Sequence, residues 1–525
     1  MRFTKRIKFT LWMGLITLNI ILRLPTTPHE IGWDSFTIHI LANSVSAFGE
    51  ARWWANPLSI GGFYPLSYAS AVPFILSGIS QLTGIGMEWT IWLFCVIIGL
   101  FSAFTAYLLA EAIWNNDIFK FLVAFGYSTS QGILSFTTWT VTTRGFFIVI
   151  APLFIYTLLK CRTSAVRYGI FTFILFILLT VTHHLFYFTI PLLISYFVVV
   201  AFHKLGNHIK SIRIPENFIN TALLASFFTM FSIPFFTREV WTTDPSLVRM
   251  GINSRYAAIS PMLVSYVRYI GPLIFFVIGG YFYILLKRGK RFEEWFLLVA
   301  SISLAPFLYM PTYTTWFIVL FAFLLISVGL SNVIKKSMQN KKYKFIIFLL
   351  IFSIIFSGYY QFVHFSNEPR QYRCERYMEE ATYVAGLWIK DNIYKNLFCN
   401  NGLTGLRAFS VSEVPTLLGG AIGLTYGFAD IGELNITKNS PLSIEFYKDG
   451  PYVKTPGTPY TLGDINALGM SEIDSRTGKR LISKYNLSYV IEDEEVGDNV
   501  FISSVHPVKN NIYDNGKILI FHLIP

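Results

Sequence analysis

Charged residues are scarce in this chain of 525 residues. They make up 14% of it, against roughly 25% in a typical soluble domain, while 53% of the residues are hydrophobic and the mean hydropathy is +0.51. Apolar runs of about 20 residues recur, and such runs predict membrane-spanning helices because a helix satisfies its own backbone in hydrocarbon. The composition therefore excludes an ordinary soluble enzyme and predicts an α-helical polytopic membrane protein.

Cysteine is scarce as well. Cys95, Cys161, Cys374 and Cys399 are too few and too widely spaced for a zinc cluster or a dense disulfide framework. Cys374 and Cys399 can pair if their part of the chain lies outside the cell, or they can remain free thiols. The sequence also lacks internal repeats, low-complexity tracts and a small-residue cleavage site after its first apolar run. We therefore expect that run to be a retained first helix.

The net charge of +12 is distributed unevenly. Residues 1–361 contain 27 Lys and Arg against 11 Asp and Glu, whereas residues 362–525 contain 15 against 19. A basic excess of this kind is typical of cytoplasmic loops, so it does not indicate a nucleic-acid partner. Five basic clusters are expected to be cytoplasmic, at residues 2–8, 160–167, 204–213, 287–291 and 335–344.

The basic clusters decide how the apolar segments thread through the membrane. The twelve segments are 9–24, 62–82, 89–113, 118–134, 145–160, 168–182, 184–202, 217–236, 262–286, 294–310, 313–331 and 344–361. All five basic clusters lie on the cytoplasmic side if one of the twelve segments does not cross the membrane. Segment 62–82 contains Pro65 and Pro73 and is the first choice for a re-entrant or surface element; segment 118–134 is the alternative. We expect about 11 crossings, with a cytoplasmic N-terminus and an extracytoplasmic C-terminus.

The same threading predicts two domains. Residues 1–361 are expected to form a transmembrane domain, with residues 25–88 as its first outer loop. Residues 362–525 open with a helical pattern and continue with short β-like runs, "YVIEDEE", "NVFISSV" and "KILIFHLI", separated by Gly, Pro and Asn. This pattern predicts a small α/β extracytoplasmic domain.

The first outer loop places a carboxylate, Asp34, between Trp33 and Phe36. One interpretation is an N-cap for an amphipathic helix lying on the membrane. The other is a general base at the rim of a cavity, where partial desolvation prepares it to accept a hydroxyl proton. If the helix extended back to Glu30, that carboxylate would share a face with Asp34.

Several arginines on the expected outer side are not explained by the positive-inside trend. Arginine near hydrocarbon is costly, and a bidentate phosphate ligand would compensate, although snorkelling to lipid headgroups is the simpler interpretation. The candidates for binding a lipid phosphate are Arg144, Arg238, Arg249, Arg255 and Arg268. Glu239 and Asp244 lie in the same outer loop as three of them, and we count both with Asp34 as candidate catalytic residues.

His183 and His184 lie together between two apolar runs. The pair can bind a phosphate or a hydroxyl, or it can be the polar hinge of a helical hairpin. No His-x-x-x-His or Glu-x-x-His spacing occurs near it, so the sequence does not indicate a metal site there.

These features together resemble the GT-C glycosyltransferases, which use polyprenyl- or dolichyl-phosphate sugars. The resemblance rests on the first helix, the outer loop with Trp-Asp near its start, "WWANPLSIGGFYPLSYA", the helical bundle and the outward C-terminal domain with "LWIKDNIYKN" and "KYNLSYVIEDEE". The GT-C family includes protein mannosyltransferases, aminoarabinose transferases and the catalytic subunits of oligosaccharyltransferases. It implies that Asp34 acts as base or organises the site.

The sequence departs from the oligosaccharyltransferase pattern in two places. The outer turn "SFTTWTVTTRG" holds no acid, and no Trp-Trp-Asp-Tyr-Gly motif occurs. These departures argue against metal dependence and against asparagine-linked transfer, although Mg²⁺ or Mn²⁺ stays open as a cofactor. No residue is assigned to a metal.

The sequence thus predicts a GT-C hexosyltransferase in the cytoplasmic membrane. It would transfer a sugar from a polyprenyl-phosphate donor to a glycan or protein acceptor at the outer face, with inversion. The first alternative is en bloc transfer of a lipid-linked oligosaccharide. The second is a transporter or a membrane scaffold without enzymatic activity. Transport is disfavoured because the notable ionisable residues lie at the rim and not at the bilayer midplane.

Overall fold

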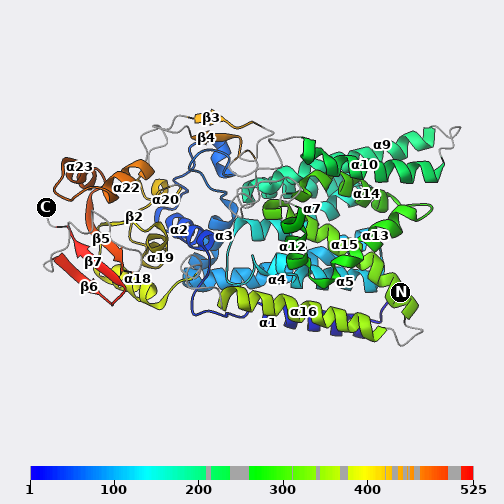
Figure 1. Ribbon diagram of the computed structural model, residues 1–525, viewed down its shortest axis with the longest axis horizontal. Helices are drawn as coiled ribbons and strands as arrows, with labels where there is room; N and C mark the ends of the chain where they lie inside the picture. Colours follow the sequence, from blue (N-terminus) through cyan, green and yellow to red (C-terminus); the bar gives the residue numbers. More distant parts are fainter. Residues whose placement is uncertain are drawn as a thin grey trace.

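The computed structural model has a long bundle of helices at one end and a smaller mixed α/β part at the other, with the two chain termini at opposite ends (Figure 1). The structure describes residues 2–208, 215–236, 259–309, 311–337, 343–366, 377–419, 421–428, 436–440, 446, 450–454, 461–494 and 510–523. The statements below concern these residues.

The bundle is built from apolar helices. It contains α1 (Lys5–Ile21), α4 (Met87–Ile113), α5 (Asp117–Thr129), α6 (Gln131–Leu134), α7 (Thr143–Lys160), α8 (Ala165–Thr182), η2 (His184–Phe188), α9 (Thr189–His208), α10 (Glu216–Phe236), α12 (Ile259–Ile270), η3 (Pro272–Ile274), α13 (Phe275–Leu286), α14 (Phe292–Leu304), η4 (Ala305–Tyr309), α15 (Pro311–Ser337) and α16 (Tyr343–Ser366). One large cluster of buried Leu, Ile, Val and Phe side chains from these helices forms the core.

Five helices in the described residues are long and apolar enough to cross a membrane. A sixth span results if Leu263–Ile270 and Pro272–Leu286 count as one, although they bend by 110° at Gly271. Gly271 has φ +82°, a conformation that favours glycine. The most apolar window of α8 is only 17% buried, as expected for a helix whose sides contact lipid. The chain is a multi-pass membrane protein.

Three short helices lie between α1 and α4: α2 (Trp33–Phe48), η1 (Pro57–Ile60) and α3 (Ala71–Thr83). At 1.5 Å per residue the 13 residues of α3 span roughly 20 Å, less than the ~30 Å of a hydrocarbon core. Helix α2 is no surface helix, since ten of its residues are buried. Its N-cap is Gly32 and Asp34 lies in its first turn, so Asp34 is not the N-cap.

The C-terminal part contains a five-stranded sheet in the order β2-β1-β5-β7-β6. Strands β2, β1 and β5 are parallel, and β7 and β6 are antiparallel to their neighbours. The strands are β1 (Asn396–Cys399), β2 (Thr416–Leu417), β5 (Leu487–Asp493), β6 (Asn511–Asp514) and β7 (Ile518–His522); the helices are α18 (Glu380–Asn392), α19 (Gly402–Ser412), α20 (Ala421–Thr425), α22 (Thr461–Gly469) and α23 (Arg476–Lys484). Two of the expected strands, "YVIEDEE" and "KILIFHLI", correspond to β5 and β7, while "NVFISSV" lies outside the described residues.

A separate antiparallel pair, β3 (Ile436–Lys438) and β4 (Tyr452–Lys454), lies apart from the main sheet (Figure 1). Cys399 is buried in β1 as a free thiol, and Cys374 is outside the described residues. Helix α2 joins the two parts of the molecule. Its Phe36 and Ile40 pack in one buried cluster with Leu403 and Phe409 of α19.

Candidate active site

A cavity of about 380 Å³ lies where the bundle meets the C-terminal part. Its walls come from the first turn of α2, from residues 61–69, from the start of α7, from the junction of α8 with η2, and from β4. Its volume is at the low end of the ~300–1,000 Å³ of small-molecule sites. Segments distant in the sequence therefore converge on one polar cavity.

Asp34 and Arg144 meet at this cavity. The Arg144 Nη2 atom donates to Asp34 Oδ2 at 3.2 Å, with side-chain exposures of 20% and 45%. Asp34 lies in the first turn of α2, where the helix dipole favours a negative charge. The pair is thus a carboxylate and a guanidinium that remain accessible from the cavity.

Hydrogen bonds to the turn before α7 position Arg144. Arg23, fully buried, donates from Nε to Thr137 Oγ1 at 2.9 Å. The Val141 N–H donates to Ser35 Oγ at 3.3 Å, which ties this turn to α2. Because both bonds are buried, they hold the start of α7 at a set distance from Asp34.

His183 and His184 also line the cavity, with ring centroids 4.0 Å apart. The Leu185 N–H donates to His183 Nδ1 at 3.0 Å, so the ring proton of neutral His183 is on Nε2. Burial, followed by the positive charges of His184 and Arg144, lowers the pKa of His183 well below its ordinary value. His183 would therefore offer a phosphate a hydrogen bond and not a positive charge.

The other predicted site residues are placed elsewhere or lie outside the described residues. Arg268 is on α12 with its guanidinium 4.7 Å from the ring centroid of Tyr360, and it is not among the residues described around the cavity. The remaining predicted residues, Arg238, Glu239, Asp244, Arg249 and Arg255, lie outside the described residues.

Sequence reasoning missed the tyrosines of the site. Tyr64, Tyr68 and Tyr452 line the cavity. Burial, followed by the charge of Asp34, raises the pKa of the Tyr68 phenol, while Arg144 and a hydrogen bond with Thr143 partly oppose this. Tyr68 is therefore a protonated phenol beside the carboxylate. The run "GGFYPLSYA" contains Tyr64 and Tyr68 and could have indicated them. No local sequence pattern distinguishes Tyr452.

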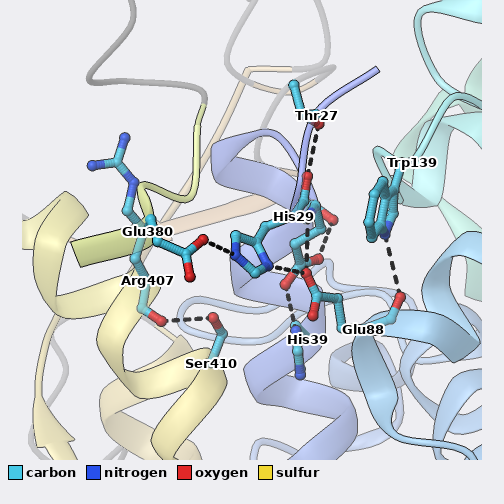
Figure 2. Close-up of polar contacts among 10 residues, drawn as sticks. Thr27, His29, His39, Glu88, Trp139, Glu380, Arg407 and Ser410 are labelled. Atoms are coloured by element: carbon cyan, nitrogen blue, oxygen red, sulfur yellow. Dashed lines mark hydrogen bonds and ion pairs between the residues drawn. The ribbon is translucent and has the colours of Figure 1, made fainter. Parts of the chain in front are cut away.

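A second polar network surrounds His29 and His39 (Figure 2). Glu30 forms an ion pair with His39 and accepts from Ser35 Oγ at 2.7 Å. Since α2 begins at Trp33, Glu30 precedes the helix and does not share a face with Asp34. Glu30 is 1% exposed, so it fixes the start of α2 from inside.

The same network connects the bundle with the C-terminal part through His29. Its Nδ1 lies 3.0 Å from Glu88 Oε1 and its Nε2 lies 3.1 Å from Glu380 Oε2 (Figure 2). The ring stacks on Tyr383 with centroids 3.8 Å apart. Burial lowers the pKa of His29, but the hydrogen bonds and charges of both glutamates outweigh burial and raise it. Protonated His29 thus bridges α4 and α18.

No protein-family model matches the sequence, and no curated protein matches it. Solved structures do match. The oligosaccharyltransferase of Archaeoglobus fulgidus, crystallised with Zn and sulfate, has a TM-score of 0.58 at 13% identity, covering 92% of this chain and 68% of its own. The archaeal oligosaccharyltransferase AglB of the same organism was solved in complex with an inhibitory peptide and a dolichol-phosphate. It has a TM-score of 0.56 at 13% identity, and the match covers 93% of this chain and 69% of AglB. ArnT from Cupriavidus metallidurans bound to undecaprenyl phosphate has a TM-score of 0.50 at 9% identity, and the match covers 99% of this chain and 98% of ArnT.

The chain therefore shares its fold with these solved structures. The resemblance expected from the sequence is thereby confirmed at the level of the fold.

The zinc in one neighbour raises the question of a metal here. Asp34 lies against the guanidinium of Arg144 and not beside a second carboxylate. Among the residues the structure describes, no three His, Cys, Asp or Glu side chains are grouped so that they could hold a metal ion. Because a divalent cation prefers several oxygen ligands, the described surroundings of Asp34 do not fit one, and no chemical step is assigned to a metal.

Proposed function

We propose that this protein is a glycosyltransferase that moves one sugar, with inversion, from a polyprenyl-phosphate donor to a hydroxyl group of an acceptor. The observation that carries the proposal is the Asp34–Arg144 pair in a polar cavity at the end of an apolar bundle. Two structural neighbours support it, since they were solved with dolichol-phosphate and with undecaprenyl phosphate.

Asp34 acts as the general base in this proposal. The acceptor oxygen attacks the anomeric carbon while its proton passes to the Asp34 carboxylate. The bond from the anomeric carbon to the phosphate oxygen breaks, and its electron pair leaves with the phosphate. Attack from the face opposite the leaving phosphate inverts the anomeric centre. The protonated carboxyl later returns the proton to water.

Arg144 acts on the departing phosphate. Guanidinium forms bidentate bonds with phosphate, and charge that develops on the leaving group is stabilised by such a preorganised cation. The Nε2–H group of His183 adds a hydrogen bond to the same phosphate. The predicted roles of Arg238, Arg249, Arg255, Arg268 and His184 in donor binding, and of Glu239 and Asp244 in holding the acceptor, belong to the proposal.

An apolar groove offers a place for the polyprenyl chain. It has a volume of about 320 Å³ and lies between α10, α13, α14 and α15. Phe228 and Ile278 in its wall are 58% and 65% exposed, so the groove opens to the surroundings of the bundle. A hydrocarbon chain can therefore enter it sideways from the membrane.

The proposal includes the topology expected from the sequence. The N-terminus is cytoplasmic, about 11 segments of residues 1–361 cross the cytoplasmic membrane, and residues 362–525 are an extracytoplasmic domain. The positions of the chain termini at opposite ends of the molecule support this arrangement (Figure 1). A sugar donor that enters from the membrane would then meet its acceptor on the outer side.

Substitution of Asp34 tests the proposed function. We expect the purified wild type to consume one of a panel of undecaprenyl-phosphate sugars, and Asp34→Asn to reduce the rate about 100-fold or more, the usual contribution of a general base. Asp391→Asn, at an exposed position on α18, is the matched control and should retain the wild-type rate.

Three outcomes would contradict the proposal in whole or in part. If the wild-type protein neither binds nor consumes any of these donors, it is not a polyprenyl-phosphate-dependent glycosyltransferase. If it consumes only lipid-linked oligosaccharides, the en bloc alternative holds. Full activity of Asp34→Asn would leave the enzyme in place and remove Asp34 from its mechanism.

A further inference from the structure

The β3–β4 pair contributes one wall of the cavity. Its pairing joins Ile436 to Lys454 and Lys438 to Tyr452, and Tyr452 lines the cavity. The ring of Tyr452 lies 6.2 Å from the ring of Tyr64, centroid to centroid. The C-terminal part therefore supplies a side chain to a cavity whose carboxylate comes from α2.

Specific packing seats this hairpin on the bundle side. Gly450 has φ +85°, and a Cβ there would lie 2.9 Å from the Cα of Phe63, so only glycine fits. The Asn439 amide donates to the Gly450 carbonyl at 2.8 Å. The ring of Phe446 lies tilted by 36° against the ring of Tyr187, with centroids 4.7 Å apart. These contacts hold Tyr452 over residues 61–68.

The lining of the cavity combines charged and aromatic groups. Asp34 and Arg144 supply the charges. Tyr64, Tyr68 and Tyr452 supply the aromatic rings, and the segment 61–69 contains no Asp, Glu, Lys or Arg. Tyrosine presents an apolar ring face and a hydroxyl. A sugar ring is complementary to both, because its C–H groups form an apolar face and its hydroxyls lie around the rim.

We propose that Tyr64 and Tyr452 form the acceptor subsite, and that the acceptor is a neutral sugar residue whose hydroxyl is directed toward Asp34. This inference rests on the proposed function. Because the two rings are 6.2 Å apart at an interplanar angle of 58°, the sugar lies against the pair and not between its rings. Tyr452 and the segment 61–69 provide no cation that would pair with a phosphorylated or acidic acceptor.

Kinetics with two kinds of acceptor, a sugar and water, distinguish a role in acceptor binding from a role in donor binding or in the fold. The full chain is given a donor that the wild type consumes, and transfer to methyl glycosides of glucose, galactose, mannose and N-acetylglucosamine is compared with transfer to water. We expect Tyr452→Ala and Tyr64→Ala each to raise the acceptor KM about tenfold, with a much smaller change in transfer to water. Tyr452→Phe keeps the ring and should change KM by no more than about threefold.

The matched control is Tyr394→Ala, which removes an 88% exposed tyrosine of the same part of the chain and should behave as wild type. Equal losses of transfer to sugar and to water in Tyr452→Ala would overturn the proposal, since they indicate a role in donor binding or in the fold. An unchanged acceptor KM in both alanine variants would overturn it as well.

A binding measurement without donor distinguishes this proposal from the proposed function. Saturation-transfer NMR should detect at least one of the four methyl glycosides on the wild type, and the signal should disappear in Tyr452→Ala and persist in Tyr394→Ala. Absence of any signal from the wild type overturns the subsite. If the signal behaves as expected but no polyprenyl-phosphate sugar is consumed, the proposed function fails while the sugar site stands.

Discussion

Asp34 shows what a single residue can and cannot indicate in advance. Its position between Trp33 and Phe36 made it a candidate base, and the structure places it beside Arg144 in a cavity, in the first turn of α2. The approach of Arg144 depends on the turn before α7, which Arg23 and Ser35 hold in place. Those two residues carry no motif, so only the folded chain identifies them.

Arg144 supports a prediction that is independent of catalysis. Arg144→Gln should weaken binding of undecaprenyl phosphate, which lacks a sugar, by about tenfold or more, corresponding to roughly 1.4 kcal/mol. The reason is that glutamine keeps a polar side chain but loses the charge and the bidentate geometry. Binding is measured by microscale thermophoresis in detergent.

Arg162→Gln is the control for this measurement, because Arg162 is 44% exposed and pairs with Glu293 away from the cavity. The prediction is wrong if Arg144→Gln binds the lipid phosphate as tightly as the wild type and Arg162→Gln do.

At the scale of elements, the connection between α4, α2 and α18 depends on residues that the sequence analysis did not single out. His29 lies between Glu88 and Glu380, stacked on Tyr383, and the backbone N–H of Glu30 donates to Glu88 at 3.2 Å. Helix α18 was expected from its pattern, but its docking on the start of α2 was not. Periodicity identifies the apolar face of an element and leaves open which partner covers it.

This bridge predicts a pH-dependent stability. The pKa of His29 is raised in the folded protein, so its stabilising contribution is fully present below the ordinary histidine value of about 6.5 and is lost as the pH rises through the raised value. We expect the Tm in detergent to fall as the pH rises above about 6.5, and Glu380→Gln to flatten that fall.

Glu413→Gln tests whether this pH dependence is specific to the bridge. Glu413 is 49% exposed and pairs with Lys390 in the same part of the chain. Removal of its charge should therefore leave the slope of Tm against pH unchanged. Identical slopes in the wild type and in Glu380→Gln would refute the role of His29.

At the scale of the whole molecule, the long axis runs from the bundle to the C-terminal part (Figure 1). Residues of both parts line the cavity. This arrangement follows the charge pattern, since the basic excess lies in residues 1–361 and not in residues 362–525. Five helices, or six with the bent pair, meet the length and hydropathy of a span. The expected count of about 11 therefore still needs a direct test.

Cysteine labelling tests the topology. In a variant without the native cysteines, Thr83→Cys should react with a membrane-impermeant maleimide from outside intact cells, and Asn115→Cys should react only after permeabilisation. Both positions are exposed, so accessibility is not limiting. They flank α4, which is long enough to cross the membrane. Labelling of both from the same side, or with the sides exchanged, would contradict the proposed threading.

The sequence by itself determined that the chain is a polytopic membrane protein, because the length and hydropathy of a span are local properties. It also indicated Asp34 and Arg144 as site candidates, the C-terminal strands β5 and β7, and the GT-C resemblance. It could not indicate that Tyr452 lies in the cavity of Asp34.

Only the tertiary structure decided which of these groups meet. Asp34 and Arg144 are 110 residues apart, His29 and Glu380 are 351 apart, and Tyr452 reaches the cavity through a hairpin seated on Phe63. Such contacts arise from the packing of many side chains at once, and no local spacing encodes them. The physical reason is that burial and hydrogen bonding are satisfied for the folded chain as a whole.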